Sequence, residues 1–160
     1  MPPVEPIPTS LLPSLVDRLT QPGSFGPAGH GTPLTLIIES VRVDVEALLN
    51  TRRNEDPELA QYPELSRSMY AFGMPEIVSR PALSTADRLA IGRAISDTIT
   101  LYEPRLRDVR TTLISPADSL ERRLKFRIEG TLRIDPAPGV EFETVLELST
   151  GQTSVMTGQS

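Results

Sequence analysis

Leu101-Tyr102-Glu103-Pro104-Arg105-Leu106 stands where the sequence changes from a helical to a strand pattern. Before this stretch apolar residues recur at the spacing of one helix face, and after it they alternate with polar residues as in a strand. Proline has no main-chain N–H and its ring clashes with the preceding helical turn, so a helix that reaches Pro104 should end there. The triplet 103–105 is therefore predicted to form a fixed corner that offers one acidic and one basic side chain.

Two long helices are predicted before this corner. Thr32 and Pro33 have the character of an N-cap and a first helical residue, and a helical apolar pattern follows them to residue 49. A second helix begins at Ser84, which has capping-box spacing to Asp87, and runs to Tyr102. A shorter apolar face in residues 11–20 predicts a two-turn helix, which must pack on its own domain or on a partner to persist.

Strands are predicted after the corner, near residues 109–113, 124–134, 140–148 and around Val155. The outward positions of the second strand are mainly basic and those of the third are mainly acidic, which favours their pairing as neighbours. Helices first and strands afterwards predict an α+β fold, with N-terminal helices packed on one face of a small C-terminal antiparallel sheet. We expect residues 1–31 to form an N-terminal arm with a short amphipathic helix, and residues 32–160 to form the main domain.

Composition limits the classes of function. A length of 160 residues suits one domain, and the net charge of -5 argues against nucleic acid as a principal partner. No run of about eighteen apolar residues is present, and the first residues lack the features of a signal peptide, so we expect no direct membrane insertion and a cytoplasmic location. The absence of cysteine rules out disulfides and thiolate zinc sites.

The residues offer little catalytic chemistry. The one histidine, His30, lies in a glycine-rich segment, so Ser-His catalysis and a histidine-based metal site have almost nothing to work with. We therefore expect no catalytic residues, no metal, no cofactor and no small-molecule substrate. Two carboxylates would still suffice for a glycosidase, which keeps a peptidoglycan-hydrolysing, lysozyme-like enzyme as the alternative function. A basic cluster spread over residues 105–125 is the only feature that favours nucleic acid.

Four segments in order resemble one known family. They are residues 14–19, the helix 40–53 with its Leu48-Leu49-Asn50-Thr51-Arg52 ending, the turn 70–76, and the triplet Glu103-Pro104-Arg105. Together they are similar to TssE, the family of baseplate proteins of bacterial type VI secretion systems. Phe72 and Glu76 depart from the family pattern at the turn.

The resemblance implies a structural role in a phage-tail-like contractile machine, without enzymatic activity. It implies that Glu103, Pro104 and Arg105 form a protein-binding site for the neighbouring baseplate subunits TssF and TssG, with TssK as a further partner. It also implies that the sheet templates the first ring of the sheath proteins TssB and TssC by strand addition. From its residues the last strand, near residues 152–157, is either an edge that accepts a strand or a frayed terminus, and the resemblance favours the accepting edge. The assembly would lie in the bacterial cytoplasm near the inner membrane.

Overall fold

The computed structural model describes residues 14–20, 34–76, 84–115, 123–134 and 137–158. Three α-helices come first, α1 (Leu15–Thr20), α2 (Leu34–Asn50) and α3 (Thr85–Tyr102), with three short 3-10 turns between α2 and α3 at Pro57–Gln61, Leu65–Arg67 and Met69–Ala71. Four strands follow, β1 (Leu106–Ser115), β2 (Arg123–Leu132), β3 (Gly139–Glu147) and β4 (Thr153–Thr157). The predicted α+β order is confirmed.

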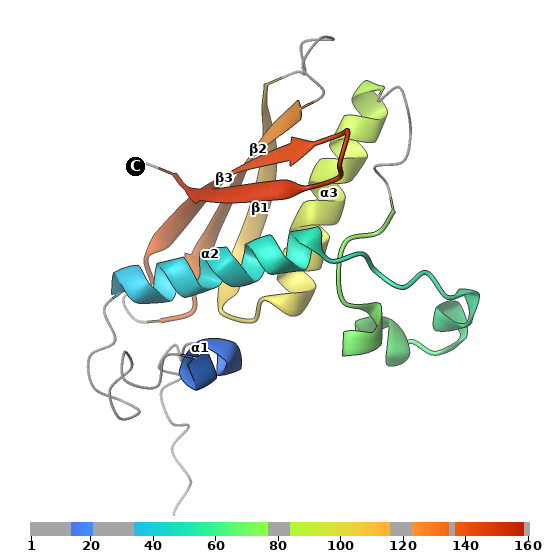
Figure 1. Cartoon of the computed structure of the whole chain (residues 1–160), viewed down its shortest axis with the longest axis horizontal. Helices are drawn as coiled ribbons and strands as arrows, with labels where there is room; N and C mark the ends of the chain where they lie inside the picture. Colours follow the sequence, from blue (N-terminus) through green and yellow to red (C-terminus); the bar gives the residue numbers. More distant parts are fainter. Residues whose placement is uncertain (1–13, 21–33, 77–83, 116–122, 135–136, 159–160) are drawn as a thin grey trace, which may run out of the picture.

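The strands form one antiparallel meander in the order β1-β2-β3-β4. Helix α3 packs on β1 and helix α2 packs beside β4 (Figure 1). Each of these two helices therefore lies along one edge strand of the sheet. The short helix α1 lies apart from the sheet, on the other side of α2. The expected pairing of basic and acidic strands is confirmed, with Arg127 of β2 placed 2.9 Å from Glu141 of β3.

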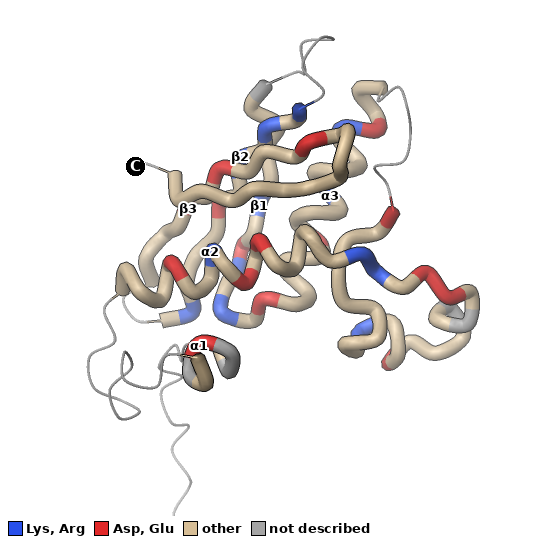
Figure 2. Tube along the Cα trace, viewed as in Figure 1, with Lys and Arg blue, Asp and Glu red and all other residues tan. Residues whose placement is uncertain are grey.

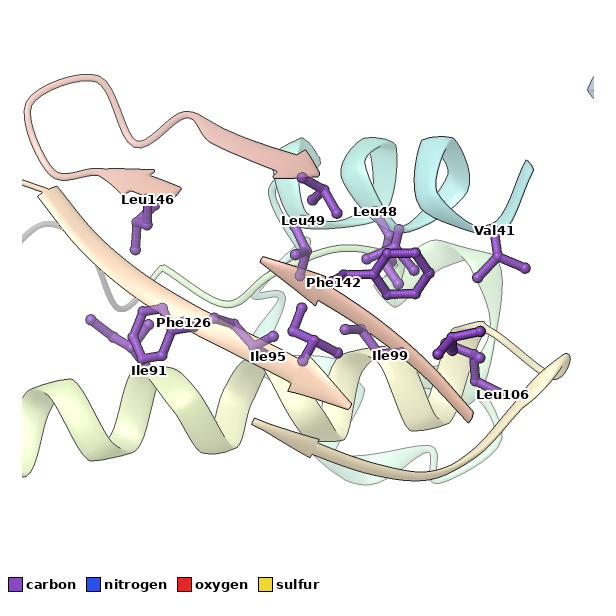
Figure 3. Packing of buried hydrophobic residues seen from close by; sticks show 14 of the residues in the cluster. Val41, Leu48, Leu49, Ile91, Ile95, Ile99, Leu106, Phe126, Phe142 and Leu146 are labelled. Carbon is purple, nitrogen blue, oxygen red and sulfur yellow. The ribbon is translucent and has the colours of Figure 1, made fainter. Parts of the chain in front are cut away.

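The core lies between the helices and the sheet. Alternate residues of the strands point inward, among them Phe126 and Phe142, which meet the apolar faces of α2 and α3 (Figure 3). Val41, Val45 and Ile99 are fully buried from the helical side. Burial of such side chains stabilises the fold by about 1.5–3 kcal/mol each.

The predicted helix boundaries agree with the structure where it describes them. Ser84 caps α3 in a capping box with Asp87, and α3 ends at Tyr102 with Glu103 as its C-cap. Thr32 and Pro33 lie outside the described residues, as do the first residues of the predicted helix 11–20. The stretch 54–66 contains one complete 3-10 turn and the start of another.

Candidate functional site

The corner at residues 103–105 is fixed by main-chain hydrogen bonds. Glu103 N–H donates to Ile99 C=O at 2.8 Å and closes the last turn of α3. Leu106 N–H donates to Glu103 C=O at 3.2 Å, and Arg133 N–H donates to Arg105 C=O at 2.9 Å. The chain therefore leaves the helix and enters β1 without a flexible connection, while Pro104 stays exposed.

The two charges of the corner are paired with each other. Arg105 donates from Nε to Glu103 Oε1 at 2.7 Å and from Nη2 to Glu103 Oε2 at 2.5 Å, which is a bidentate pair. Only 4% of Glu103 is exposed. A buried carboxylate is tolerated here because the guanidinium supplies both hydrogen bonds and the opposite charge.

Arg105 also ties the corner to helix α2. Its Nη2 donates to Asp44 Oδ2 at 2.5 Å and its Nη1 donates to Ser40 Oγ at 3.0 Å. Ser40 and Asp44 stand four residues apart and so lie on one side of α2. Charged residues of both signs gather where α2 passes the chain between α3 and β1 (Figure 2).

Helix α1 continues this network. Ser40 Oγ donates to Asp17 Oδ2 at 2.5 Å, and Asp17 and Ser14 exchange hydrogen bonds at the start of α1. Asp17, Ser40 and Asp44 were not among the site residues predicted from the sequence. The i,i+4 spacing of Ser40 and Asp44 is visible in the sequence, but this spacing does not indicate that both residues bind Arg105.

The network shifts the pKa values of its members in different directions. Burial acts to lower the pKa of Arg105, but the contacts with Glu103 and Asp44 outweigh it and raise that pKa. Burial raises the pKa of Asp44 despite its contact with Arg105. Burial acts to raise the pKa of Asp17, but the hydrogen bonds from Ser40 and Ser14 outweigh burial and lower this pKa. Arg105 thus remains a fixed cation among three carboxylates.

The sequence analysis offered Glu103 and Arg105 as charges for a partner. The structure uses both charges within the chain, and of the triplet Pro104 is the exposed member. Docking of partner proteins at this corner remains a prediction.

A second joint brings two of the motif segments together. Met74 N–H donates to Thr51 C=O and Arg53 N–H donates to Met74 C=O, both at 2.8 Å, so the end of α2 pairs with the turn 70–76. Gly73 has a φ of 116°, and a Cβ at that position would lie 2.4 Å from the Thr51 carbonyl oxygen. Glycine is thus required by both conformation and space.

Helix α2 closes the outer edge of β4. Asn50 donates from Nδ2 to Thr153 C=O and accepts at Oδ1 from Thr153 N–H, both at 2.8 Å. Glu46 Oε2 accepts from Val155 N–H at 3.3 Å, and Arg42 Nη1 donates to Val155 C=O at 2.8 Å. The prediction of an open edge at this strand therefore does not hold over Thr153–Val155, because the side chains of α2 occupy the main-chain groups that an added strand would use.

Within the described part of the chain, no group of three or more metal-ligating side chains is placed to hold a metal ion, and no helix is long and apolar enough to cross a membrane.

A protein-family model, described as baseplate wedge protein gp25, matches residues 37–137, more than half of the chain. No curated protein and no solved structure matches significantly. The matched span contains most of α2, the Gly73 turn, α3, the corner and the first two strands. The chain belongs to the baseplate wedge protein gp25 family, which is the family of TssE.

Proposed function

We propose that this chain is a structural baseplate component of a type VI secretion machine, where it links the wedge subunits to the contractile sheath and templates sheath assembly. The observation that carries this proposal is the family match over residues 37–137. TssF and TssG would meet the corner, TssK would complete the baseplate assembly, and TssB and TssC would form the sheath on the sheet. The assembly would form in the bacterial cytoplasm beside the inner membrane.

The geometry of the corner supports a docking role. A paired and mostly buried Glu103 and Arg105 cannot be displaced without a large cost, so the turn keeps one shape. A surface that is already in its bound shape loses little conformational entropy on association. Pro104 adds a main-chain constraint at the exposed point of the turn.

The carboxylates near the corner also fit a non-enzymatic role. Glu103 is bound by Arg105, and Asp44 shares the same guanidinium. A hollow of about 380 Å³ at the end of α2 is lined by Glu46 and Glu76, but Glu46 binds Arg42 and Val155, and Glu76 lies near Arg52. These acids have roles in holding the fold, so we favour assembly over hydrolysis.

Co-purification tests the proposal. The tagged full chain should bring TssF and TssG out of a lysate of cells that carry the secretion system. Pro104→Arg should weaken this association by about tenfold or more, since a bulky charge would stand at the exposed turn without touching the buried pair. Ser154→Arg, at an exposed position of β4, is the matched control and should bind normally.

Two results would count against the proposal. Recovery of no baseplate or sheath subunit with the wild-type chain would remove the assembly role, and normal binding by Pro104→Arg would move docking away from the corner. A zymogram addresses the alternative enzyme. Clearing of peptidoglycan by the purified chain, lost on substitution of a carboxylate, would establish hydrolysis in its place.

A further inference from the structure

The outer edge of β1 differs from the outer edge of β4. The bond from Arg133 N–H to Arg105 C=O fixes the odd-numbered residues of β2 as those that face β1. Arg127 therefore faces β1 and its partner there is Thr112, so the main-chain groups of Thr111 and Leu113 point away from the sheet. Ser96 of α3 donates to Val109 C=O at 3.1 Å. Beyond that bond, no described residue outside the sheet binds the main chain of Thr111 or Leu113.

A groove of about 320 Å³ runs between α3 and this edge. Half-buried Val109 and Leu113 and the buried ring of Phe126 line it from the sheet, and the exposed Leu89 lines it from α3. Helix α3 lies close to the floor of the groove at Gly92, where a Cβ would be in van der Waals contact with the Phe126 ring at 3.5 Å. The groove thus places an apolar surface directly beside unpaired strand groups.

Three arginines, Arg88, Arg93 and Arg110, surround the groove, and one acid, Asp97, accompanies them. Three positive charges less one negative charge leave an excess of two positive charges there, on a chain whose net charge is -5. Within the described residues none of these three arginines is in an ion pair or a side-chain hydrogen bond. This contrasts with Arg42 and Arg105, which each bind two carboxylates.

Two polar atoms in the groove are buried and have no partner, namely Arg88 Nε and Thr111 Oγ1. A buried donor without an acceptor costs about 1–3 kcal/mol in general, so such groups are normally satisfied by a protein or a ligand. Arg88 comes from α3 and Thr111 from β1, so a single molecule lying in the groove would satisfy both.

We propose that the groove between α3 and β1 binds an extended acidic segment of a partner protein. The segment adds to the sheet as a strand beside Thr111 and Leu113, and its carboxylates bind Arg88, Arg93 and Arg110. The inference rests on the proposed function and assigns strand addition there to the β1 edge, because α2 occupies the β4 edge. Apolar lining and free strand groups favour a protein strand over a nucleic acid, which needs neither.

A peptide probe tests the inference with the full chain. The probe is a labelled decapeptide of alternating glutamate and valine, compared with its lysine–valine counterpart and with a copy N-methylated at alternate residues. We expect the acidic peptide to bind, the basic one not to bind, and the N-methylated one to bind at least about tenfold more weakly, since it cannot complete the strand ladder. Amide exchange at Thr111 and Leu113 should slow, with no change at Val155.

Variants locate the binding site. Arg88→Ala combined with Arg93→Ala should weaken binding of the acidic peptide by about tenfold or more, because each lost charged hydrogen bond is worth about that factor. Arg123→Ala is the control, since Arg123 lies on β2 outside the groove and 3.8 Å from Glu147. The inference is overturned if the N-methylated peptide binds as tightly as the unmodified acidic peptide. It is also overturned if the acidic peptide binds equally well after both arginines have been replaced. Stronger binding of a single-stranded oligonucleotide at the same arginines overturns it in favour of nucleic acid.

The outcomes separate this inference from the proposed function. A chain that co-purifies with TssF and TssG but does not bind the acidic peptide retains its baseplate role and loses the groove assignment. A chain that binds the peptide at Arg88 and Arg93 but recovers no baseplate or sheath subunit keeps the groove as a strand-binding site and loses the proposed function.

Discussion

The two edges of the sheet are both antiparallel strands, β1 and β4, but the neighbouring helices contact their outward main-chain groups very differently. At β4, side chains of α2 bind all four outward main-chain groups of Thr153 and Val155. At β1, α3 supplies one bond, from Ser96 to Val109, and leaves Thr111 and Leu113 free of described partners outside the sheet. In this sheet the side chains of the neighbouring helix decide whether these main-chain groups are occupied.

The difference follows from how polar residues are arranged on the helices. On α2 the row Arg42, Glu46 and Asn50 recurs every four residues along one flank of the apolar face, while Ser40 and Asp44 lie on the other flank. One flank binds β4 and the other binds Arg105. On α3 the long side chains Arg88 and Arg93 reach the groove beyond the edge instead of binding its main chain.

Removing the buried carboxylate at the corner should have the largest effect, because Arg105 connects the start of β1 with α2. Glu103→Ala leaves the guanidinium without its buried bidentate partner, and breaking a buried pair in this way typically costs about 3–5 kcal/mol. Urea denaturation monitored by circular dichroism measures the change. Arg107→Ala, at an exposed neighbouring position, should stay within about 0.5 kcal/mol of the wild type. An unaltered midpoint for Glu103→Ala would show that the network does not hold the corner.

Crowding the second joint should have the next largest effect. Gly73→Ala forces a Cβ against the Thr51 carbonyl in a strained conformation and should destabilise the chain by about 2–3 kcal/mol. Gly151→Ala is the control, because its φ is also positive at 71° but no atom lies within 4 Å of the added carbon. Thermal melting compares the two. Equal losses would mean that contact with Thr51 adds nothing to the conformational strain.

Opening the β4 edge tests the difference between the edges directly. Asn50→Ala removes both hydrogen bonds to Thr153 and should cost about 1–2 kcal/mol. Amide exchange at Thr153 should become faster and approach that of Thr111 at the open edge. Asn50→Asp keeps an acceptor for Thr153 N–H, so protection of that amide should be partly retained. If exchange at Thr153 does not change, Asn50 does not close the edge.

The smallest of these effects is expected at low pH, where protonation of Asp17 should weaken the contact between α1 and α2. The folded pKa of Asp17 lies below its ordinary value of 3.8, so the stability it contributes is present above pH 3.8 and is lost as the pH falls through the lower folded value. Asp44 has the opposite sign, because burial raises its pKa and its contribution is lost as the pH rises. NMR shifts of residues 14–20 should therefore change below pH 3.8, and Asp17→Asn should abolish that change. A transition that persists in Asp17→Asn would assign it to another group.

Much of the fold was predictable from local patterns. The change of period at 101–106, the capping box at Ser84 and the alternation in residues 124–146 each depend on neighbours a few residues apart. The family motifs likewise marked the segments that meet at the Gly73 joint. Two contacts were not anticipated from the sequence, the bond from Arg105 to Asp44 and the bonds by which Asn50 closes β4, because the partners are distant in the sequence.

The sequence by itself determined the order of helices and strands, the end of α3 at the proline corner and the inward face of each strand. These features follow from hydrogen-bond periodicity, proline geometry and burial of alternate residues. Only the tertiary structure decided that Arg105 binds Asp44 and that Asn50 closes β4, since these pairs are 61 and 103 residues apart. A side chain can bind a distant group only after packing has placed its helix beside it, and local spacing holds no information about that placement.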